Sequence, residues 1–168
     1  TSNDAIQVNL VGTNNVVKVD SGGGSDAVTI NLGGSGTVDV NDSGSDGTDS
    51  VVVNGTSNAD TMTIITTSVT RTGGETINLS GIEALTLNGG NGDDNFVITS
   101  SPNLVIQING DDGTDVATFV GGAGNETFAI TSISVSADNG WIVNYNGIES
   151  LVVNGGAGDD IFNVTSWN

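Results

Sequence analysis

One long segment of this chain occurs twice, and this internal repeat limits the possible folds more than any other feature. Residues 81–100 (GIEALTLNGGNGDDNFVITS) return at 147–166 as GIESLVVNGGAGDDIFNVTS, a shift of 66 in residue number. Shorter segments that start at Ser45 and Gly55 recur with the same shift. Self-similarity at a fixed period is typical of architectures in which each unit packs on its neighbours. We therefore predict a single repetitive β domain over 1–168, with repeats at 22–88, 89–154 and a partial copy at 155–168.

A nine-residue motif lies inside the long repeat. It reads G-G-x-G-x-D-x-U-x, where U is a large apolar residue, and full copies begin at Gly89 and Gly155. Degenerate copies begin at Ser21, Gly44, Gly55, Gly110 and Gly121. The starting positions of successive copies differ by 23, 11, 34, 21, 11 and 34. These intervals lie near one, one-half and one-and-a-half times a common period of about 22.

The intervals predict an all-β parallel solenoid, a β-roll-like coil with about 22 residues per lap, a strand on each side and a turn at each end. The many Val, Ile and Thr residues suit strands, and Gly, Asn and Asp suit turns. Each long repeat then makes three laps. We expect protruding hairpins around residues 73–74 and 139–140, where the segments exceed one strand and one turn. An antiparallel β-sandwich is the alternative, because several strands alternate and turns recur at short, regular intervals.

Charge and composition exclude several classes of function. The chain has 20 acidic and two basic residues, a formal net charge of −18, and neither His nor Cys. Such a chain cannot neutralise phosphates, so we expect no nucleic-acid partner. Disulfides, Cys or His zinc sites and His-dependent nucleophiles are excluded, and we expect no enzyme. The longest aliphatic run is 51–53, which predicts no membrane insertion.

The acidic residues are concentrated in turns, with 16 Asp against four Glu. We expect most of these turns on one edge of the coil, with Asp60 and Glu126 on the opposite edge. Stacked carboxylates repel one another unless a cation neutralises them, and Ca²⁺ binds through carboxylate and carbonyl oxygens. The alternative is that these residues only form Asx turns and keep the surface soluble. The candidate Ca²⁺ ligands are Asp26, Asp46, Asp49, Asp93, Asp94, Asp112, Asp115, Asp159 and Asp160.

The two full nonapeptides resemble the hemolysin-type calcium-binding repeat of the RTX family. The longer unit is similar to degenerate versions in large secreted bacterial surface proteins. This resemblance implies export, calcium-dependent folding outside the cell and stacked sites between successive turns. It also implies that Asp94 and Asp160 take the family's Asp role, whereas Glu126 replaces that Asp. The motif copies are not in tandem, so the continuous row of sites is interrupted.

The predicted function is that of a structural, extracellular, calcium-binding β-solenoid module of a secreted or cell-surface protein. No charged-plus-apolar leader opens the sequence, so a secreted protein is expected in its mature form. Open solenoid ends expose strand edges, and copies of the chain are therefore the expected partners, in a head-to-tail filament or in adhesion. The alternative is a carbohydrate-binding module of a secreted polysaccharide-active enzyme. An extracellular glycan would then stack on Trp141, Tyr145 or Trp167.

Overall fold

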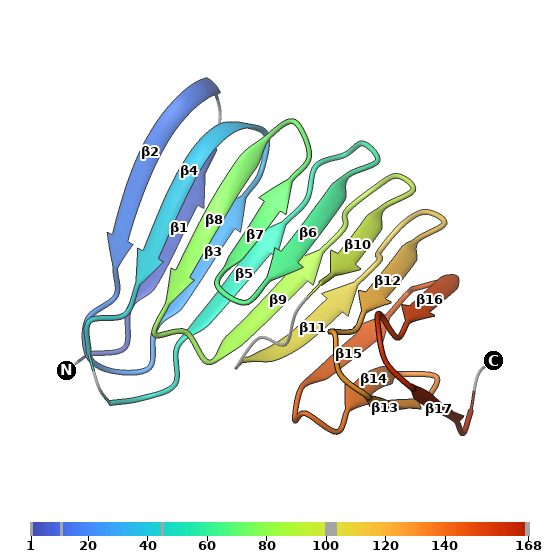
Figure 1. The fold of residues 1–168 in the computed structure, drawn as a ribbon. Coiled ribbons are helices and arrows are strands. Elements are labelled where there is room, and N and C mark those ends of the chain that lie inside the picture. Colours follow the sequence, from blue (N-terminus) through green and yellow to red (C-terminus); the bar gives the residue numbers. More distant parts are fainter. Residues whose placement is uncertain (1, 11, 45, 100–103, 167–168) are drawn as a thin grey trace.

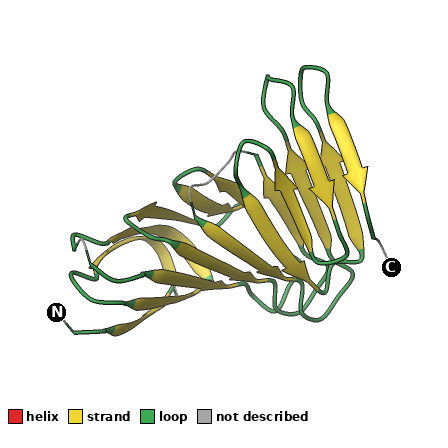
Figure 2. Cartoon of the chain, turned by 90° about the horizontal axis from the view of Figure 1, so that it is seen from below, coloured by secondary structure: helices red, strands yellow, loops and turns green. Residues whose placement is uncertain are grey.

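The chain is all-β, as the composition predicts. The computed structural model describes residues 2–10, 12–44, 46–99 and 104–166, and these residues form seventeen strands and no helix. The strands form two sheets, and one hydrophobic cluster draws its members from both. Figure 1 shows the strands side by side in a long stack with the two termini at opposite ends, and Figure 2 shows the same stack from below.

The larger sheet has nine strands, and all of them except β14 run in the same direction. Its first five members are parallel neighbours, and they follow one another along the stack in the order of the sequence. In spatial order the strands are β1 (Ala5–Asn9), β3 (Ala27–Asn31), β5 (Ser50–Asn54), β9 (Ala84–Asn88), β11 (Val105–Asn109), β15 (Ile142–Asn146), β14 (Ser134–Ala137), β13 (Thr127–Ile130) and β17 (Ile161–Val164).

The smaller sheet has eight strands, and here β7 is the one that runs against the others. In spatial order they are β2 (Gly12–Asp20), β4 (Gly34–Asn41), β8 (Glu75–Ser80), β7 (Ser68–Arg71), β6 (Thr61–Ile65), β10 (Asn95–Ile98), β12 (Val116–Val120) and β16 (Ser150–Asn154).

Most parallel neighbours are separated in sequence by intervals close to those between the motif copies, whereas β4 with β8 and β11 with β15, which a meander precedes, differ by 39 and 37. Ala5 pairs with Ala27, which pairs with Ser50, so the residue numbers differ by 22 and then by 23. Ser50 pairs with Ala84 and Ala84 with Val105, with differences of 34 and 21. Because most pairings in both sheets are parallel, the structure does not have the strand arrangement of an antiparallel β-sandwich.

The two long segments are three-stranded meanders inside the sheets, and the expectation of protruding hairpins is wrong. β6, β7 and β8 are antiparallel neighbours in the eight-stranded sheet, and β8 continues as the parallel neighbour of β4. β13, β14 and β15 form the same meander in the nine-stranded sheet. Val69 and Val135, on the middle strands, are fully buried in the core. Each middle strand therefore widens the core.

Equivalent strands of successive repeats lie in opposite sheets. β5 belongs to the nine-stranded sheet, and β12, the equivalent strand of the next repeat, belongs to the eight-stranded sheet. β6 and β13 exchange sheets in the same way, as do β10 and β17. Of the seven connections from β5 to β12, five cross between the sheets, because the two meander turns do not. One repeat therefore makes two and a half circuits, and the expectation of three laps is wrong.

Five neighbouring strands of the nine-stranded sheet each end in an asparagine, and the side chains of these asparagines form a row of hydrogen bonds. The amide of Asn31 donates to Asn9, and that of Asn54 donates to Asn31, over 2.6 and 2.7 Å. The row continues with Asn88, which donates to Asn54, and with Asn109, which donates to Asn88, each over 2.7 Å. These bonds fix the register of the strands at the point where each turn begins.

Candidate metal centre and acidic ladders

The acidic turns lie on two edges of the molecule, so the expectation of one acidic edge is wrong. We call the edge where the chain enters the nine-stranded sheet the first edge, and the edge where it leaves that sheet the second edge. Since the meander shifts later turns by half a circuit, Asp60 shares its edge with Asp94, and Glu126 shares its edge with Asp160. The first edge holds turns 21–26, 42–49, 81–83, 121–126 and 155–160, and the second holds 32–33, 55–60, 89–94, 110–115 and 147–149.

On the second edge, acidic residues form a ladder that runs from strand to strand. The backbone N–H of Asp60 donates to Oδ1 of Asp94, and that of Asp94 donates to Oδ1 of Asp115, each over 2.7 Å. Asp115 in turn donates to Oε2 of Glu149 over 2.8 Å. Each carboxylate therefore satisfies the backbone of the preceding layer, which gives the Asp that closes the nonapeptide a structural role.

The second oxygen of these buried carboxylates faces the first glycine of its own turn. A Cβ built on Gly89 would lie 2.2 Å from Oδ2 of Asp94, and one on Gly110 would lie 2.4 Å from Oδ2 of Asp115. Both oxygens are buried and have no hydrogen-bond partner among the described residues. Burial, with the neighbouring carboxylates, raises the pKa of Asp94 to about 6 and also raises the pKa of Asp115. The spacing of Gly and Asp in the motif thus follows from turn packing.

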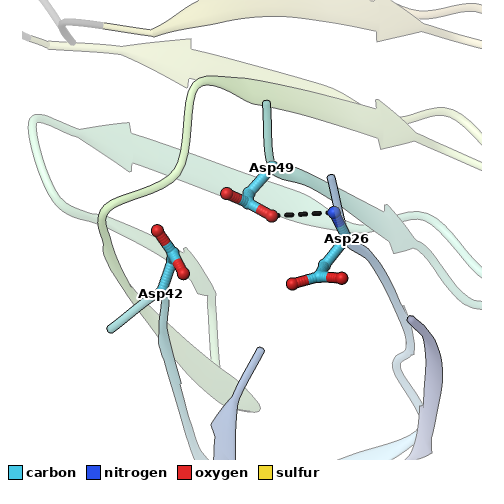
Figure 3. A group of neighbouring side chains, drawn as sticks. All are labelled: Asp26, Asp42 and Asp49. Carbon is cyan, nitrogen blue, oxygen red and sulfur yellow. Dashed lines mark hydrogen bonds between the residues drawn. The ribbon is translucent and has the colours of Figure 1, made fainter. Parts of the chain in front are cut away.

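On the first edge, three carboxylates meet in one place. Asp26 precedes β3, Asp42 follows β4 and Asp49 precedes β5, and one oxygen of each lies within 4.8 Å of the others. Figure 3 shows the three side chains turned toward one another from neighbouring segments. The backbone N–H of Asp26 donates to Oδ1 of Asp49 over 2.8 Å, so this group belongs to a second ladder, built like the first.

The surroundings of the Asp26–Asp42–Asp49 group disfavour three bare negative charges. Asp26 and Asp49 are each 2% exposed, and Oδ2 of Asp26 has no hydrogen-bond partner among the described residues. Burial raises the pKa of Asp49, and the charges of Asp42, Asp26 and Glu83 raise it further. A divalent cation would reverse this penalty and supply a partner for the buried oxygen.

The geometry of this group fits Ca²⁺. Calcium–oxygen distances of about 2.3–2.6 Å allow two ligands of one ion to be up to roughly 5 Å apart, and the three oxygens here lie within 4.8 Å. Ser21, whose buried Oγ also has no partner among the described residues, and Asp42 directly follow the paired strand ends Asp20 and Asn41. Oxygen ligands of this kind, with no nitrogen or sulfur, are typical of a hard cation.

The structure separates the other predicted ligands. Asp46 is exposed on the same turn as Asp49 but outside the group of three carboxylates. Asp93 is exposed and accepts the N–H of Thr114. Asp112 is also exposed, and its backbone forms an isolated β-bridge with Asn91. Asp160 accepts the N–H of Glu126 over 2.9 Å, and Asp159 beside it is exposed. Of the nine predicted residues, only Asp26 and Asp49 join the group of three.

Two parts of these edges were not predicted from the sequence. Asp42 starts a loop rather than closing a motif, so no motif position marks it as a ligand. Arg71 lies in the meander strand β7 and forms ion pairs with two acidic residues. Its Nε lies 2.7 Å from Glu75, and its Nη1 lies 3.4 Å from Asp60 on the second edge. Glu75 is fully buried and also accepts the N–H groups of Gly33 and Gly34. Burial alone would raise the pKa of Glu75, but the contact with Arg71 and the two N–H groups outweigh burial and lower this pKa.

The aromatic residues proposed for glycan stacking are core residues where the structure describes them. Trp141 is 6% exposed, stacks on Phe119 with ring centroids 5.9 Å apart and meets Phe128 edge-on. Tyr145 is also buried, and its hydroxyl donates to the carbonyl of Thr131. Trp167 lies outside the described residues. Neither Trp141 nor Tyr145 offers a ring face to a sugar.

No protein-family model, curated protein or solved structure matches this chain. The resemblance of the nonapeptides to the RTX repeat therefore stays a prediction from the motif. Across the described residues there is no helix of the length and apolarity needed to cross a membrane.

Proposed function

We propose that this chain is a structural β-solenoid module of a secreted or cell-surface protein, and that Ca²⁺ bound between its turns stabilises it. The solenoid is supported by parallel neighbours whose residue numbers differ by one motif period, and by five sheet-to-sheet crossings in each repeat. Its structural role is supported by the acidic ladders, in which carboxylates accept backbone N–H groups and so join successive layers.

The observation that carries the calcium proposal is the group of Asp26, Asp42 and Asp49. Two of its carboxylates are almost completely buried, one of their oxygens lacks a partner among the described residues, and the three oxygens fit around one ion. Extracellular fluid supplies Ca²⁺ at concentrations that fill weak sites of about 10⁻⁴–10⁻³ M, which suits a module outside the cell. The absence of cysteine makes a cation the natural cross-link between layers.

Urea unfolding at increasing Ca²⁺ tests this proposal. A site that binds only the folded chain raises the free energy of unfolding by about 2.7 kcal/mol when Ca²⁺ is 100 times its dissociation constant. We expect this gain in the natural chain and its loss in Asp42→Asn, which keeps an oxygen for the N–H of Gly44 but removes the charge. Asp46→Asn is the matched control, since it removes one charge from the same turn outside the group.

The outcomes separate a specific site from general screening. If Mg²⁺ stabilises the natural chain as well as Ca²⁺ does, or if Asp46→Asn loses as much stabilisation as Asp42→Asn, the effect comes from the overall charge of −18. Equal stability in chelator and in saturating Ca²⁺ would refute the proposal. Isothermal titration of the folded chain gives the dissociation constant independently.

A further inference from the structure

The C-terminal end of the stack exposes core side chains. Figure 1 shows β16 and β17 at this end. Phe162 and Val164 on β17 are 44% and 61% exposed, although their strand neighbours Phe128 and Ile130 are buried. An apolar hollow of about 380 Å³ lies here, lined by Ile130, Leu151, Val153, Phe162 and Val164.

The internal repeat shows what covers these positions elsewhere in the same chain. One repeat earlier, Phe96 and Ile98 on β10 occupy the positions of Phe162 and Val164, and they are 0% and 1% exposed. They are buried because β12 pairs in parallel with β10. In the other sheet, β11 pairs in the same way with β9, the equivalent of β16. Among the described residues, no pair of strands equivalent to β11 and β12 covers β16 and β17.

The N-terminal end of the chain carries such a pair. Residues 5–20 align with residues 105–120 at a constant shift of 100, so β1 (AIQVN) matches β11 (VIQIN), and the second half of β2 matches β12. The residues that face inward correspond as well, with Ile6 for Ile106 and Val17 for Ala117. β1 and β2 are the edge strands of the two sheets at this end, so each has a strand partner on one side only among the described strands.

The register of β10 with β12 pairs exposed apolar residues from the two ends. Asn95 pairs with Val116 and Phe96 with Ala117, which places Val16 on Ile161 and Val17 on Phe162. Val16 and Ile161 are 66% and 56% exposed, so the contact would cover part of two exposed aliphatic side chains. The register of β9 with β11 likewise places Asn9 on Asn154, which would extend the asparagine row.

Charge also permits this contact. In the interior, the N–H of Asp94 donates to the carboxylate of Asp115, so two acidic residues meet at this point. At the corresponding point between two copies, Asp160 meets Asn15, so no second carboxylate is added.

We propose that the C-terminal end of one copy binds the N-terminal end of a second copy of this chain, with β1 parallel to β16 and β2 parallel to β17. Repeated from copy to copy, this contact produces a head-to-tail filament. Because β1 of the nine-stranded sheet continues the eight-stranded sheet of its neighbour, each copy is turned by about half a circuit relative to the next. Sheets of nine and eight strands at about 4.8 Å spacing give roughly 40 Å per copy. The inference rests on the proposed structural module, but it does not depend on the cation.

Sedimentation velocity over about 1–300 μM protein in saturating Ca²⁺ tests the contact, because association follows mass action. The natural chain should grow beyond a dimer as its concentration rises, and more so in high salt, which screens its charge. Val164→Asp should lower the association constant by about tenfold or more, because it places a charge in the apolar contact. Val105→Asp is the matched control: Val105 is 62% exposed, as Val164 is at 61%, but it lies on β11, away from both ends.

Mixing two blocked variants tests the polarity of the contact. Val16→Asp blocks the N-terminal end and Val164→Asp the C-terminal end, so each variant alone should be monomeric. Their mixture should give a 1:1 heterodimer that grows no further. Circular dichroism and urea unfolding of each variant identify any that fails to fold, and Val16→Thr and Val164→Thr, which add no charge, then replace it as weaker blocks.

Each outcome decides the proposal. A natural chain that stays monomeric overturns it, as does a closed dimer that Val16→Asp leaves intact, which would mean contact between two C-terminal ends. The calcium proposal is tested separately by urea unfolding of the monomeric Val164→Asp chain. It fails if Ca²⁺ does not raise the free energy of unfolding of this chain. Assembly of the natural chain in chelator would then leave the end-to-end contact standing without the cation.

Discussion

The backbone N–H of Asp94 donates to Oδ1 of Asp115 over 2.7 Å, and both carboxyl groups are almost completely buried. Asp94 and Asp115 each use Oδ1 to accept the backbone N–H of the preceding layer. Their Oδ2 atoms stay in turns where no described group donates to them. The ladder therefore holds the layers together while it keeps acidic groups away from water.

This arrangement predicts a stability that falls as the pH rises, when no cation is present. Burial and the neighbouring carboxylates raise the pKa of Asp94 from 3.8 to about 6. The contribution of this proton is complete below the unfolded pKa and is lost as the pH rises through the folded pKa. Urea unfolding in chelator should therefore give a lower free energy of unfolding at pH 7 than at pH 5.

Asp94→Asn should flatten this pH dependence and raise stability at pH 7, because the amide keeps the Oδ1 acceptor without a buried charge. Asp93→Asn, in the same turn but exposed, should leave the slope between pH 5 and 7 unchanged. An unaltered slope in Asp94→Asn would show that another group carries the titration.

Arg71 should be the more important of the two basic residues for stability. Its guanidinium contacts Glu75, which is fully buried, and Asp60, which is 5% exposed. Arg71→Met leaves both carboxylates without their cation and should cost about 3–5 kcal/mol in the free energy of unfolding at pH 7. Lys18→Met removes the same charge from an exposed site on β2 and should change it by less than about 0.5 kcal/mol.

The pH dependence of Arg71→Met gives a second measurement of the same network. In the natural chain the pKa of Glu75 is lowered, so this group stabilises above its unfolded pKa and the effect is lost as the pH falls through the folded pKa. In Arg71→Met, Glu75 keeps the N–H groups of Gly33 and Gly34 but loses the cation, so burial raises its pKa relative to the natural chain. The stability gap between the two chains should therefore narrow as the pH is lowered.

The sequence predicts the strands and their spacing well because these are local and periodic. The buried strands show inside–outside alternation, and the period of the motif reappears as the offset between parallel neighbours. It does not predict that β7 and β14 join the sheets, since a long segment with a Gly-containing turn is equally consistent with a free hairpin. That one difference moves Asp94 and Asp115 to the edge that holds Asp60, and Glu126 to the edge that holds Asp26 and Asp49.

The candidate site is predicted only in part for the same reason. Asp26 and Asp49 occupy the motif position, and that position marks them in the sequence. Asp42 opens the same 42–49 loop that Asp49 closes, but it lies outside the motif, so the motif does not mark it as a ligand. The motif Asp residues on the second edge look identical in sequence, yet there the structure gives a hydrogen-bonded ladder without a group of three among the described residues.

Two phenylalanines at the same repeat position should differ in their importance. Phe96 is fully buried between β6 and β12, whereas Phe162 is 44% exposed at the end of the stack. Phe96→Ala should cost about 3–5 kcal/mol in the free energy of unfolding, and Phe162→Ala less than half as much. Both are measured by urea unfolding in the Val164→Asp background, so that association between copies does not add to the result. Equal losses would mean that Phe162 is covered within a single copy.

The close contact between Gly110 and its neighbours predicts a sensitive position in the degenerate motif. A Cβ on Gly110 would lie 1.8 Å from the carbonyl oxygen of Gly147 and 2.4 Å from Oδ2 of Asp115, and neither atom is free to move. Gly110→Ala should therefore cost about 3 kcal/mol, because it pushes two layers apart. Gly124→Ala is the matched control, since its nearest neighbour, Oε1 of Glu126, would be 3.5 Å away, and it should change stability by less than about 0.5 kcal/mol. Thermal and urea unfolding of the two variants compare them directly, and a tolerated Gly110→Ala would show that the layers can separate at this turn without losing the ladder.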